Sequence, residues 1–150
     1  MNFLIKVHTD GSCLGNPGVG GYGAYLQKFK DGELIIEAEL KGSNKETTNN
    51  RMEMMAIVKA MEFLNIKEIK DSQIEFYSDS SLIINTLNKN WKRKANTDIW
   101  VRMQGEINEL QANFNKLKFH WVKGHAGIKE NEIVHNLAFN AATKLKKELS

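Results

Sequence analysis

Short apolar runs near the start of the chain, one of them partly alternating with polar positions, predict three β-strands joined by short links. Asp31-Gly32 between two of these runs is typical of a hairpin turn. Beyond them, helical spacing of apolar positions alternates with two further strand-like runs. The predicted strands are residues 3–9, 22–29, 34–41, 73–78 and 116–122, and the predicted helices are a first one capped by 47–50 and ending near 65, then 80–87, 97–112 and 130–149.

This order of elements predicts an α/β fold with a mixed five-stranded sheet flanked by helices. The first three strands should form an antiparallel meander, and the last two should each lie parallel to a neighbour through right-handed crossovers. No repeat or linker divides the chain, so we expect one domain over residues 1–150. Because Met1 lies almost on the first strand and the chain ends with its last helix, we expect a free-standing protein.

The composition is that of a soluble globular protein, with 41% hydrophobic and 26% charged residues. No apolar run reaches the roughly 18 residues that a membrane helix needs. The first residues lack a signal-peptide pattern, which favours the cytoplasm. The single cysteine, Cys13, excludes an intramolecular disulfide, and we expect a neutral thiol.

The net charge of +3 is compatible with a polyanionic partner but does not identify one. The local charge is more informative, because cations surround Trp91 at Lys89, Lys92, Arg93 and Lys94. Such a patch suits phosphate contacts with an aromatic ring nearby. The alternative is a solvated helix end with ordinary lysines.

Three glycines, Gly18, Gly20 and Gly23, match the spacing GxGxxG. A dinucleotide site needs a helix after them, whereas residues 24–27 continue a strand, so we reject that interpretation. The glycines are expected to form a tight turn and to admit other backbone closely. Methionines 52, 54, 55 and 61 are expected to fill the core from the first helix.

The apolar run 3–7 leads to Asp10, and the Gly/Ser/Asn/Pro sequence after it predicts that the strand stops there. Ligands in open α/β sheets gather outside the carboxyl ends of strands, so Asp10 is a candidate metal ligand. An isolated Asp-Gly is more often only the start of a turn. Whether Asp10 is a metal ligand or only the start of a turn depends on whether other acidic residues lie near it.

Two distant acids are expected to meet Asp10. Glu53 falls on the helix face of Ala56, Ala60 and Leu64, which should pack on the sheet. Asp79 ends the fourth strand and would lie beside Asp10 if those strands are parallel. Adjacent carboxylates repel, so the cluster favours a divalent ion, and ligation by oxygen alone suits Mg²⁺ or Mn²⁺. The alternative for Glu53 is a favourable interaction with the helix dipole.

His125 lies between glycines just after the fifth predicted strand. A histidine in a loop at that edge could exchange protons near neutral pH. An exposed loop histidine without a role is the alternative.

Several blocks of the chain together resemble the ribonuclease H family, type 1. They occur in the family's order and span nearly the whole chain. The blocks are His8-Thr9-Asp10-Gly11-Ser12 with Gly15-Asn16-Pro17-Gly18, Thr47-Thr48-Asn49-Asn50-Arg51-Met52-Glu53, Ser78-Asp79-Ser80, Asn90-Trp91 with Asp98-Ile99-Trp100, and Lys123-Gly124-His125-Ala126-Gly127 with Glu130-Asn131-Glu132.

The resemblance implies the sheet order 3-2-1-4-5, with the second strand antiparallel, and an endonuclease that uses two divalent ions to cut the RNA strand of RNA–DNA hybrids. It assigns metal ligation and catalysis to Asp10, Glu53 and Asp79, and proton movement or product release to His125. Hybrid contacts are implied at Gly11, Ser12, Cys13, Asn16, Thr48, Asn49, Ser80, Trp91 and Trp100. RNA would be told from DNA by its 2′-hydroxyl, which backbone groups near Gly11 could read.

The chain departs from the family in two places. His135 stands where the family has a fourth carboxylate, and an imidazole there would tolerate Mn²⁺ better than Mg²⁺. His135 is therefore expected to be a ligand, or to act through water, or to be a surface histidine. Second, only eight residues separate Trp91 from Trp100, where many bacterial members have a long basic protrusion.

Three functions remain open on the sequence alone. The first is an active, monomeric ribonuclease H in primer and R-loop removal. The second is a hybrid-binding protein whose catalysis is weakened because His135 replaces an acid. The third is a related DNA-cutting nuclease or a domain of a reverse transcriptase.

Overall fold

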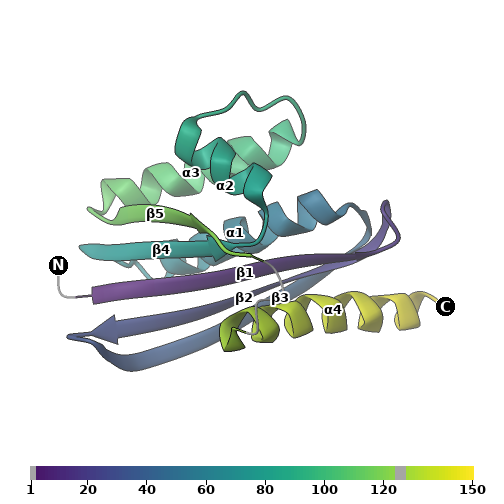
Figure 1. Ribbon diagram of the computed structural model, residues 1–150, viewed down its shortest axis with the longest axis horizontal. Helices are drawn as coiled ribbons and strands as arrows, with labels where there is room; N and C mark the ends of the chain where they lie inside the picture. The colour runs from purple at the N-terminus through teal and green to yellow at the C-terminus, as the bar shows by residue number, and fades with distance from the viewer. Residues whose placement is uncertain (1–2, 124–127) are drawn as a thin grey trace.

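The structure is a computed structural model that describes residues 3–123 and 128–150. It contains one mixed sheet with helices on both faces (Figure 1). The strands are β1 (Phe3–Leu14), β2 (Gly18–Lys30), β3 (Glu33–Thr47), β4 (Ser72–Ser78) and β5 (Lys116–Trp121), and the helices are α1 (Asn49–Ile66), α2 (Ser81–Lys89), α3 (Thr97–Ala112) and α4 (Lys129–Leu149).

The strand order is β3-β2-β1-β4-β5, as the family resemblance implied. Strand β2 is antiparallel to β1 and β3, while β4 lies parallel to β1 and β5 parallel to β4. The hairpin between β2 and β3 turns at Asp31 and Gly32, both with positive φ, as an Asp-Gly turn requires. The register therefore places the ends of β4 and β5 at one edge, beside the middle of β1.

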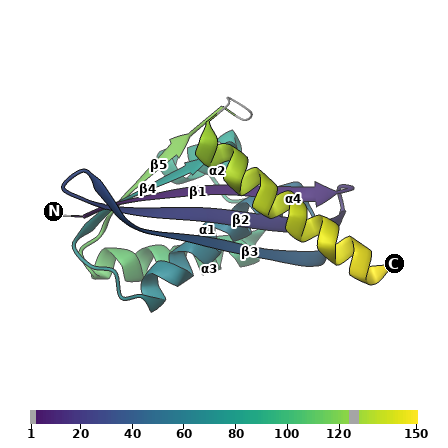
Figure 2. The ribbon, with the colours of Figure 1, turned by 90° about the horizontal axis from the view of Figure 1, so that it is seen from below.

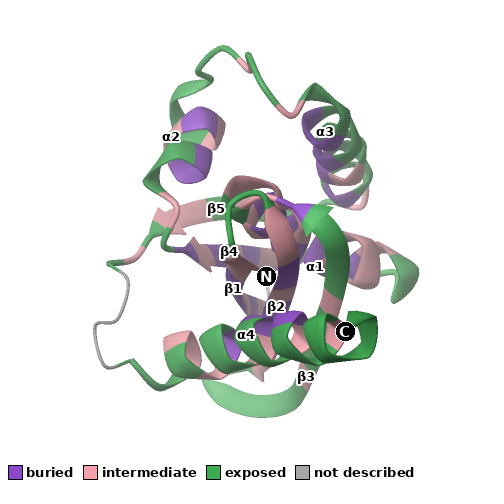
Figure 3. Cartoon of the chain, turned by 90° about the vertical axis from the view of Figure 1, so that its right-hand side faces the viewer, coloured by how far each residue is buried: buried purple, intermediate pink, exposed green. Residues whose placement is uncertain are grey.

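The helices form two layers around this sheet. Figure 2 shows α4 crossing β1, β2 and β3 on one face, with α1 and α3 on the other. The core lies under α1, where Met54, Met61 and Phe76 are fully buried. The predicted face of Ala56, Ala60 and Leu64 is buried there too. In Figure 3 the buried residues of α4 lie on its side toward the sheet.

Glycines of β2 let α4 approach the sheet closely. A Cβ on Gly21 would fall 2.7 Å from the backbone nitrogen of Ala142, and one on Gly23 would fall 2.6 Å from the Leu137 Cβ. For Gly23, one of the three glycines of the sequence pattern, this confirms the expected close approach of other backbone, since the Val134 carbonyl oxygen would lie 3.0 Å from the added Cβ. The prediction that these glycines form a tight turn is wrong, because they lie in β2; the chain turns at residues 15–17, where Gly15 has a positive φ.

The first three strands are longer than the sequence predicted. The prediction that β1 stops at Asp10 is wrong, because its ladder with β2 continues to the pair Leu14–Val19. Likewise β3 runs on to Thr47 instead of ending at Lys41. The small residues after Asp10 are typical of turns, but a partner strand rich in glycine keeps them extended. Cross-strand pairing outweighs the local preference.

Candidate metal centre

Asp10 lies in the middle of β1, just beyond the last residue pair that joins β1 to β4, His8–Tyr77. The residue pairs between β1 and β4 end there, so Asp10 lies where the two strands part. Asp10 is nevertheless buried, with 8% of its surface exposed. Its position as a candidate ligand thus comes from the end of its neighbour strand and not from the end of its own.

Glu53 reaches the same place from the second turn of α1. Thr48 caps this helix by accepting a hydrogen bond from the Arg51 N–H, which begins the helix directly after β3 ends. The helix can lie against β1 only because Gly11 has no side chain: a Cβ there would meet the backbone nitrogen of Glu53 and lie 2.5 Å from the Met52 carbonyl carbon. The Gly11 N–H donates to Glu53 Oε1 at 3.1 Å.

Asp79 follows β4 directly, in the bend before α2. Ser80 caps α2 by accepting from the Ile83 N–H, and the Ser80 N–H donates to Ser78 Oγ at 3.1 Å. The strand thus changes into a helix within a few residues, and Asp79 stands at the change. This matches the predicted position of Asp79 beside β1.

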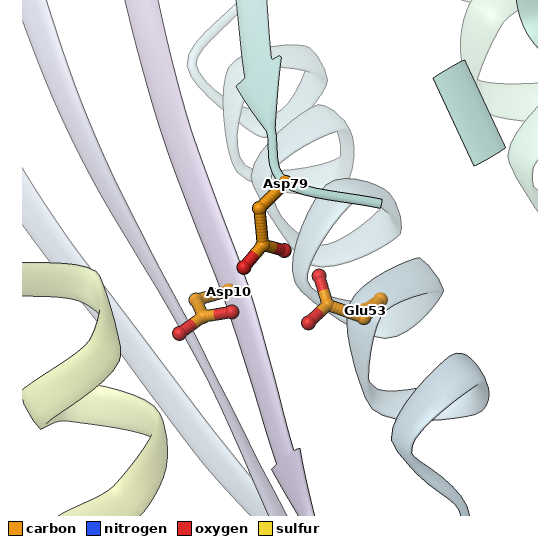
Figure 4. A group of neighbouring side chains, drawn as sticks. All are labelled: Asp10, Glu53 and Asp79. Atoms are coloured by element: carbon orange, nitrogen blue, oxygen red, sulfur yellow. The ribbon is translucent and has the colours of Figure 1, made fainter. Parts of the chain in front are cut away.

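Figure 4 shows the three carboxylates pointing toward one another from β1, α1 and the end of β4. One ligand atom from each lies within 4.8 Å of the other two. Burial raises the pKa of Glu53 well above its usual value, and the negative charges of Asp10 and Asp79 raise it further. The structure therefore holds three acids in an arrangement that their mutual repulsion opposes.

The donor set fits a divalent cation. Glu53 Oε2 is buried and lacks a hydrogen-bond donor among residues 3–123 and 128–150. A buried carboxylate oxygen without a donor is costly unless a cation compensates it. Three carboxylates supply only hard oxygen ligands, as Mg²⁺ and Mn²⁺ prefer. Asp10, Glu53 and Asp79 are the residues that could hold such an ion.

His135 on α4 borders this cluster. Its Nδ1 lies 3.2 Å from Asp10 Oδ2, and nearly half of its side chain is exposed. The imidazole also stacks on Phe139, one helical turn later. The structure thus brings His135 to the acids, at the position predicted from the resemblance, and leaves its expected role as a ligand untested.

Several residues expected at the hybrid also have structural partners. Thr48 and Ser80 are helix caps, and Asn16 Oδ1 accepts from the N–H of Asn49 at 3.1 Å. The Cys13 thiol donates to the Gly15 carbonyl, and burial raises its pKa, as expected for a neutral thiol. Ser12 and Cys13 belong to β1 and not to a turn. The sequence suggested that Gly11 lets the substrate come close. In the structure it is the backbone of α1 that lies close to Gly11.

The two tryptophans lie in different environments. Trp91 is exposed after α2 and has Lys89 over its ring. Trp100 is buried in the core, with Arg93 over its ring at 5.0 Å. Trp91 is therefore accessible at the surface with Lys89, whereas Trp100 packs in the interior beneath Arg93.

Sequence reasoning gave Arg51 no role. Its guanidinium pairs with the Asp98 carboxylate at 2.8 and 3.0 Å and also donates to Asn96 Oδ1. This pair joins the first turn of α1 to the start of α3. No local signal could reveal it, because the partners are 47 residues apart. His125, the other expected catalytic residue, lies outside the described residues.

Solved structures with the same architecture define the class of fold. The crystal structure of LC9-RNase H1, described as a type 1 RNase H with the type 2 active-site motif, matches with a TM-score of 0.79 at 28% identity, over 96% of this chain and 74% of that one. LC11-RNase H1 in complex with RNA/DNA hybrid matches with a TM-score of 0.75 at 25% identity, over 94% and 98%. The fold is that of ribonuclease H.

Sequence relatives identify the family. Residues 4–143 match the family described as RNase H. Ribonuclease H of Rhodopseudomonas palustris (strain BisB5) is 40% identical over 153 residues, covering 93% of each protein. Ribonuclease H of Haemophilus influenzae (strain 86-028NP) is 40% identical over 155 residues, covering 95% of this chain and 92% of the relative. The chain belongs to the ribonuclease H family.

Proposed function

We propose that this protein is an endonuclease that hydrolyses the RNA strand of RNA–DNA hybrids and leaves 5′-phosphate and 3′-hydroxyl ends. The observation that carries the proposal is the cluster of Asp10, Glu53 and Asp79 at one edge of a ribonuclease H fold. Among the relatives, LC11-RNase H1 is described with an RNA/DNA hybrid. Removal of primers and R-loops is the cellular task that such an activity suits.

Asp10, Glu53 and Asp79 would hold two divalent ions, Mg²⁺ or Mn²⁺, at the scissile phosphate. Bound there, the ions supply an activated water and stabilise the leaving oxygen. The protein contributes placement: the Gly11 N–H holds the Glu53 carboxylate, and the strand-to-helix bend brings Asp79 beside it. His125 is assigned to proton movement or product release.

The cationic residues around Trp91 would bind the phosphates of the hybrid. Lys92 and Lys94 are exposed, and Arg93 is held over the Trp100 ring. Gly11, Ser12, Cys13, Asn16, Thr48, Asn49 and Ser80 are proposed to line the path of the hybrid near the acids. Asn16 and Thr48 would do so from the same positions in which they order the start of α1.

Cleavage of three matched duplexes tests the proposal. An RNA–DNA hybrid, an RNA–RNA duplex and a DNA–DNA duplex of one sequence are incubated with Mg²⁺ and, separately, with Mn²⁺. We expect cleavage of the hybrid alone, in its RNA strand. Cleavage of the DNA duplex, or of no duplex with either ion, would refute the assignment.

A hybrid-binding protein with weakened catalysis is the second candidate, and His135 beside Asp10 favours it. A neutral imidazole supplies less charge to a cation than a carboxylate. We expect His135→Asp to lower the Mg²⁺ concentration needed for half-maximal cleavage more than the Mn²⁺ concentration, because Mn²⁺ accepts nitrogen ligands better. Metal-dependence curves of both proteins measure this, and identical curves would remove His135 from the mechanism.

We further propose a cytoplasmic monomer. No helix within residues 3–123 and 128–150 has the length and apolar character to cross a bilayer. Analytical ultracentrifugation of the protein alone and with hybrid would test the oligomeric state.

A further inference from the structure

The indole of Trp121 lies against the bend that carries Asp79. Trp121 is the last residue of β5, and its Nε1–H donates to the Asp79 carbonyl at 3.0 Å. Trp121 is 54% exposed, which is unusual for a tryptophan that only fills a core. The hydrogen bond from the indole to the Asp79 carbonyl thus distinguishes Trp121 from a tryptophan that only packs.

The end of β5 holds the backbone on both sides of the Asp79 α-carbon. Trp121 pairs with Ser78 in the sheet, and the Val122 N–H donates to the Ser78 carbonyl at 2.9 Å. The next carbonyl along the chain, that of Asp79, accepts from the indole. The carbonyls of Ser78 and Asp79 are therefore bound by Val122, which follows β5, and by Trp121, its last residue.

This restraint acts where the structure is under electrostatic stress. Asp79 lies beside Asp10 and Glu53, and like charges at this separation favour movement apart. Asp79 stands in a bend after its strand, whereas Asp10 is fixed inside β1 and Glu53 inside α1. Rotation of the bend is consequently the easiest way to relieve the repulsion, and the Trp121 hydrogen bond opposes it.

We propose that Trp121 is a positioning residue, whose indole N–H holds the Asp79 carboxylate in place for a divalent ion before the ion binds. The inference rests on the proposed function, since it concerns the same three acids. A neutral hydrogen bond contributes modestly to stability, so its loss should weaken ion binding by about three- to tenfold. Ground-state binding of hybrid should not change, because the indole acts through Asp79.

The test removes the donor and keeps the ring. Trp121 is replaced by β-(3-benzothienyl)alanine, in which sulfur takes the place of the N–H, and in a second protein by Trp121→Phe. The same benzothienyl replacement at Trp91, another exposed tryptophan, is the matched control. Binding of Mn²⁺ is measured by titration calorimetry without substrate, and kcat and KM for the hybrid are measured at limiting Mn²⁺.

We expect both Trp121 variants to bind Mn²⁺ about three- to tenfold more weakly and to lose kcat with KM for the hybrid unchanged. The control at Trp91 should keep the Mn²⁺ affinity of the unmodified protein. Unchanged Mn²⁺ affinity in the benzothienyl variant at position 121, with or without a lower Tm, would overturn the inference and leave the proposed function standing. Failure of the unmodified protein to bind Mn²⁺ without substrate would also overturn the inference, whereas the proposed function depends on cleavage of the hybrid.

Discussion

Glu53 carries a large electrostatic cost in the candidate site. Its carboxylate is buried, its Oε2 lacks a donor in the part of the chain that the structure describes, and two other acids face it. Burial and these charges raise its pKa, so the folded state disfavours the ionised form. Such a residue lowers the stability of the metal-free protein, and a bound cation is needed to compensate its charge.

Glu53→Gln should therefore stabilise the metal-free protein and abolish ion binding. The amide can still accept from Gly11 and removes the buried charge, so we expect about 0.5–2 kcal/mol of added stability. Denaturant unfolding with EDTA, and again with Mg²⁺, measures the change. Glu68→Gln, an exposed change after α1, should stay within about 0.5 kcal/mol. Lower stability of Glu53→Gln in EDTA would contradict the electrostatic interpretation.

At the scale of elements, the contact between α1 and β1 sets the position of Glu53. The helix backbone lies directly against Gly11, and the Gly11 N–H holds the carboxylate. A packed contact of two backbones leaves no room for adjustment. The distance between this helix and strand is thus part of the site.

Gly11→Ala should push α1 away from β1. The added methyl group meets backbone atoms of Met52 and Glu53, so we expect a loss of about 1–3 kcal/mol and weaker ion binding. Thermal unfolding and Mn²⁺ titration measure both effects. Gly105→Ala is the control, because a Cβ there meets nothing within 4 Å in the middle of α3 and should stabilise by about 0.5–1 kcal/mol. An unchanged ion affinity in Gly11→Ala would show that the contact tolerates displacement.

The pair of Arg51 and Asp98 joins α1 to α3 and makes a pH-dependent contribution. The Arg51 guanidinium lowers the pKa of Asp98 to about 2, from an ordinary value of 3.8. A lowered folded-state pKa gives stability that is present above the unfolded value and is lost as pH falls toward the folded value. The pair should thus act fully above about pH 5 and fade between about pH 4 and 2.

Asp98→Asn tests this contribution. We expect a small decrease in Tm at neutral pH, because the pair is exposed, a smaller difference at about pH 2, and convergence with the unchanged protein below it. Melting curves from about pH 2 to 7 provide the measurement. A difference in Tm that persists undiminished at the acid end of this range would mean that the substitution disturbs packing instead of charge.

For the whole molecule, the sequence predicted the sheet order and the meeting of three acids. The parallel placement of β4 and β5 follows from periodicity and from the connection rules for strands, and the family resemblance supplied the full order. The sequence pattern did not predict where β1 and β3 end, because those ends depend on the partner strand. The sequence also left open whether Trp100 and Asp98 serve packing or substrate, and it did not predict the Arg51–Asp98 pair. Both depend on how α3 packs, which residue types and spacing do not encode.

The chain-wide charge of +3 gives little attraction to nucleic acid, so affinity should depend on the local cations between α2 and α3. We expect Lys92→Gln with Lys94→Gln to raise KM for the hybrid and to leave ion binding unchanged. Each lost phosphate contact should reduce the slope of log affinity against log salt by about 1. Affinity measured from about 50 to 200 mM salt gives the slope.

Lys146→Gln with Lys147→Gln, at the exposed end of α4, removes the same charge and should leave the slope unchanged. Equal slopes for the two double variants would show that net charge, and not the residues around Trp91, attracts the hybrid.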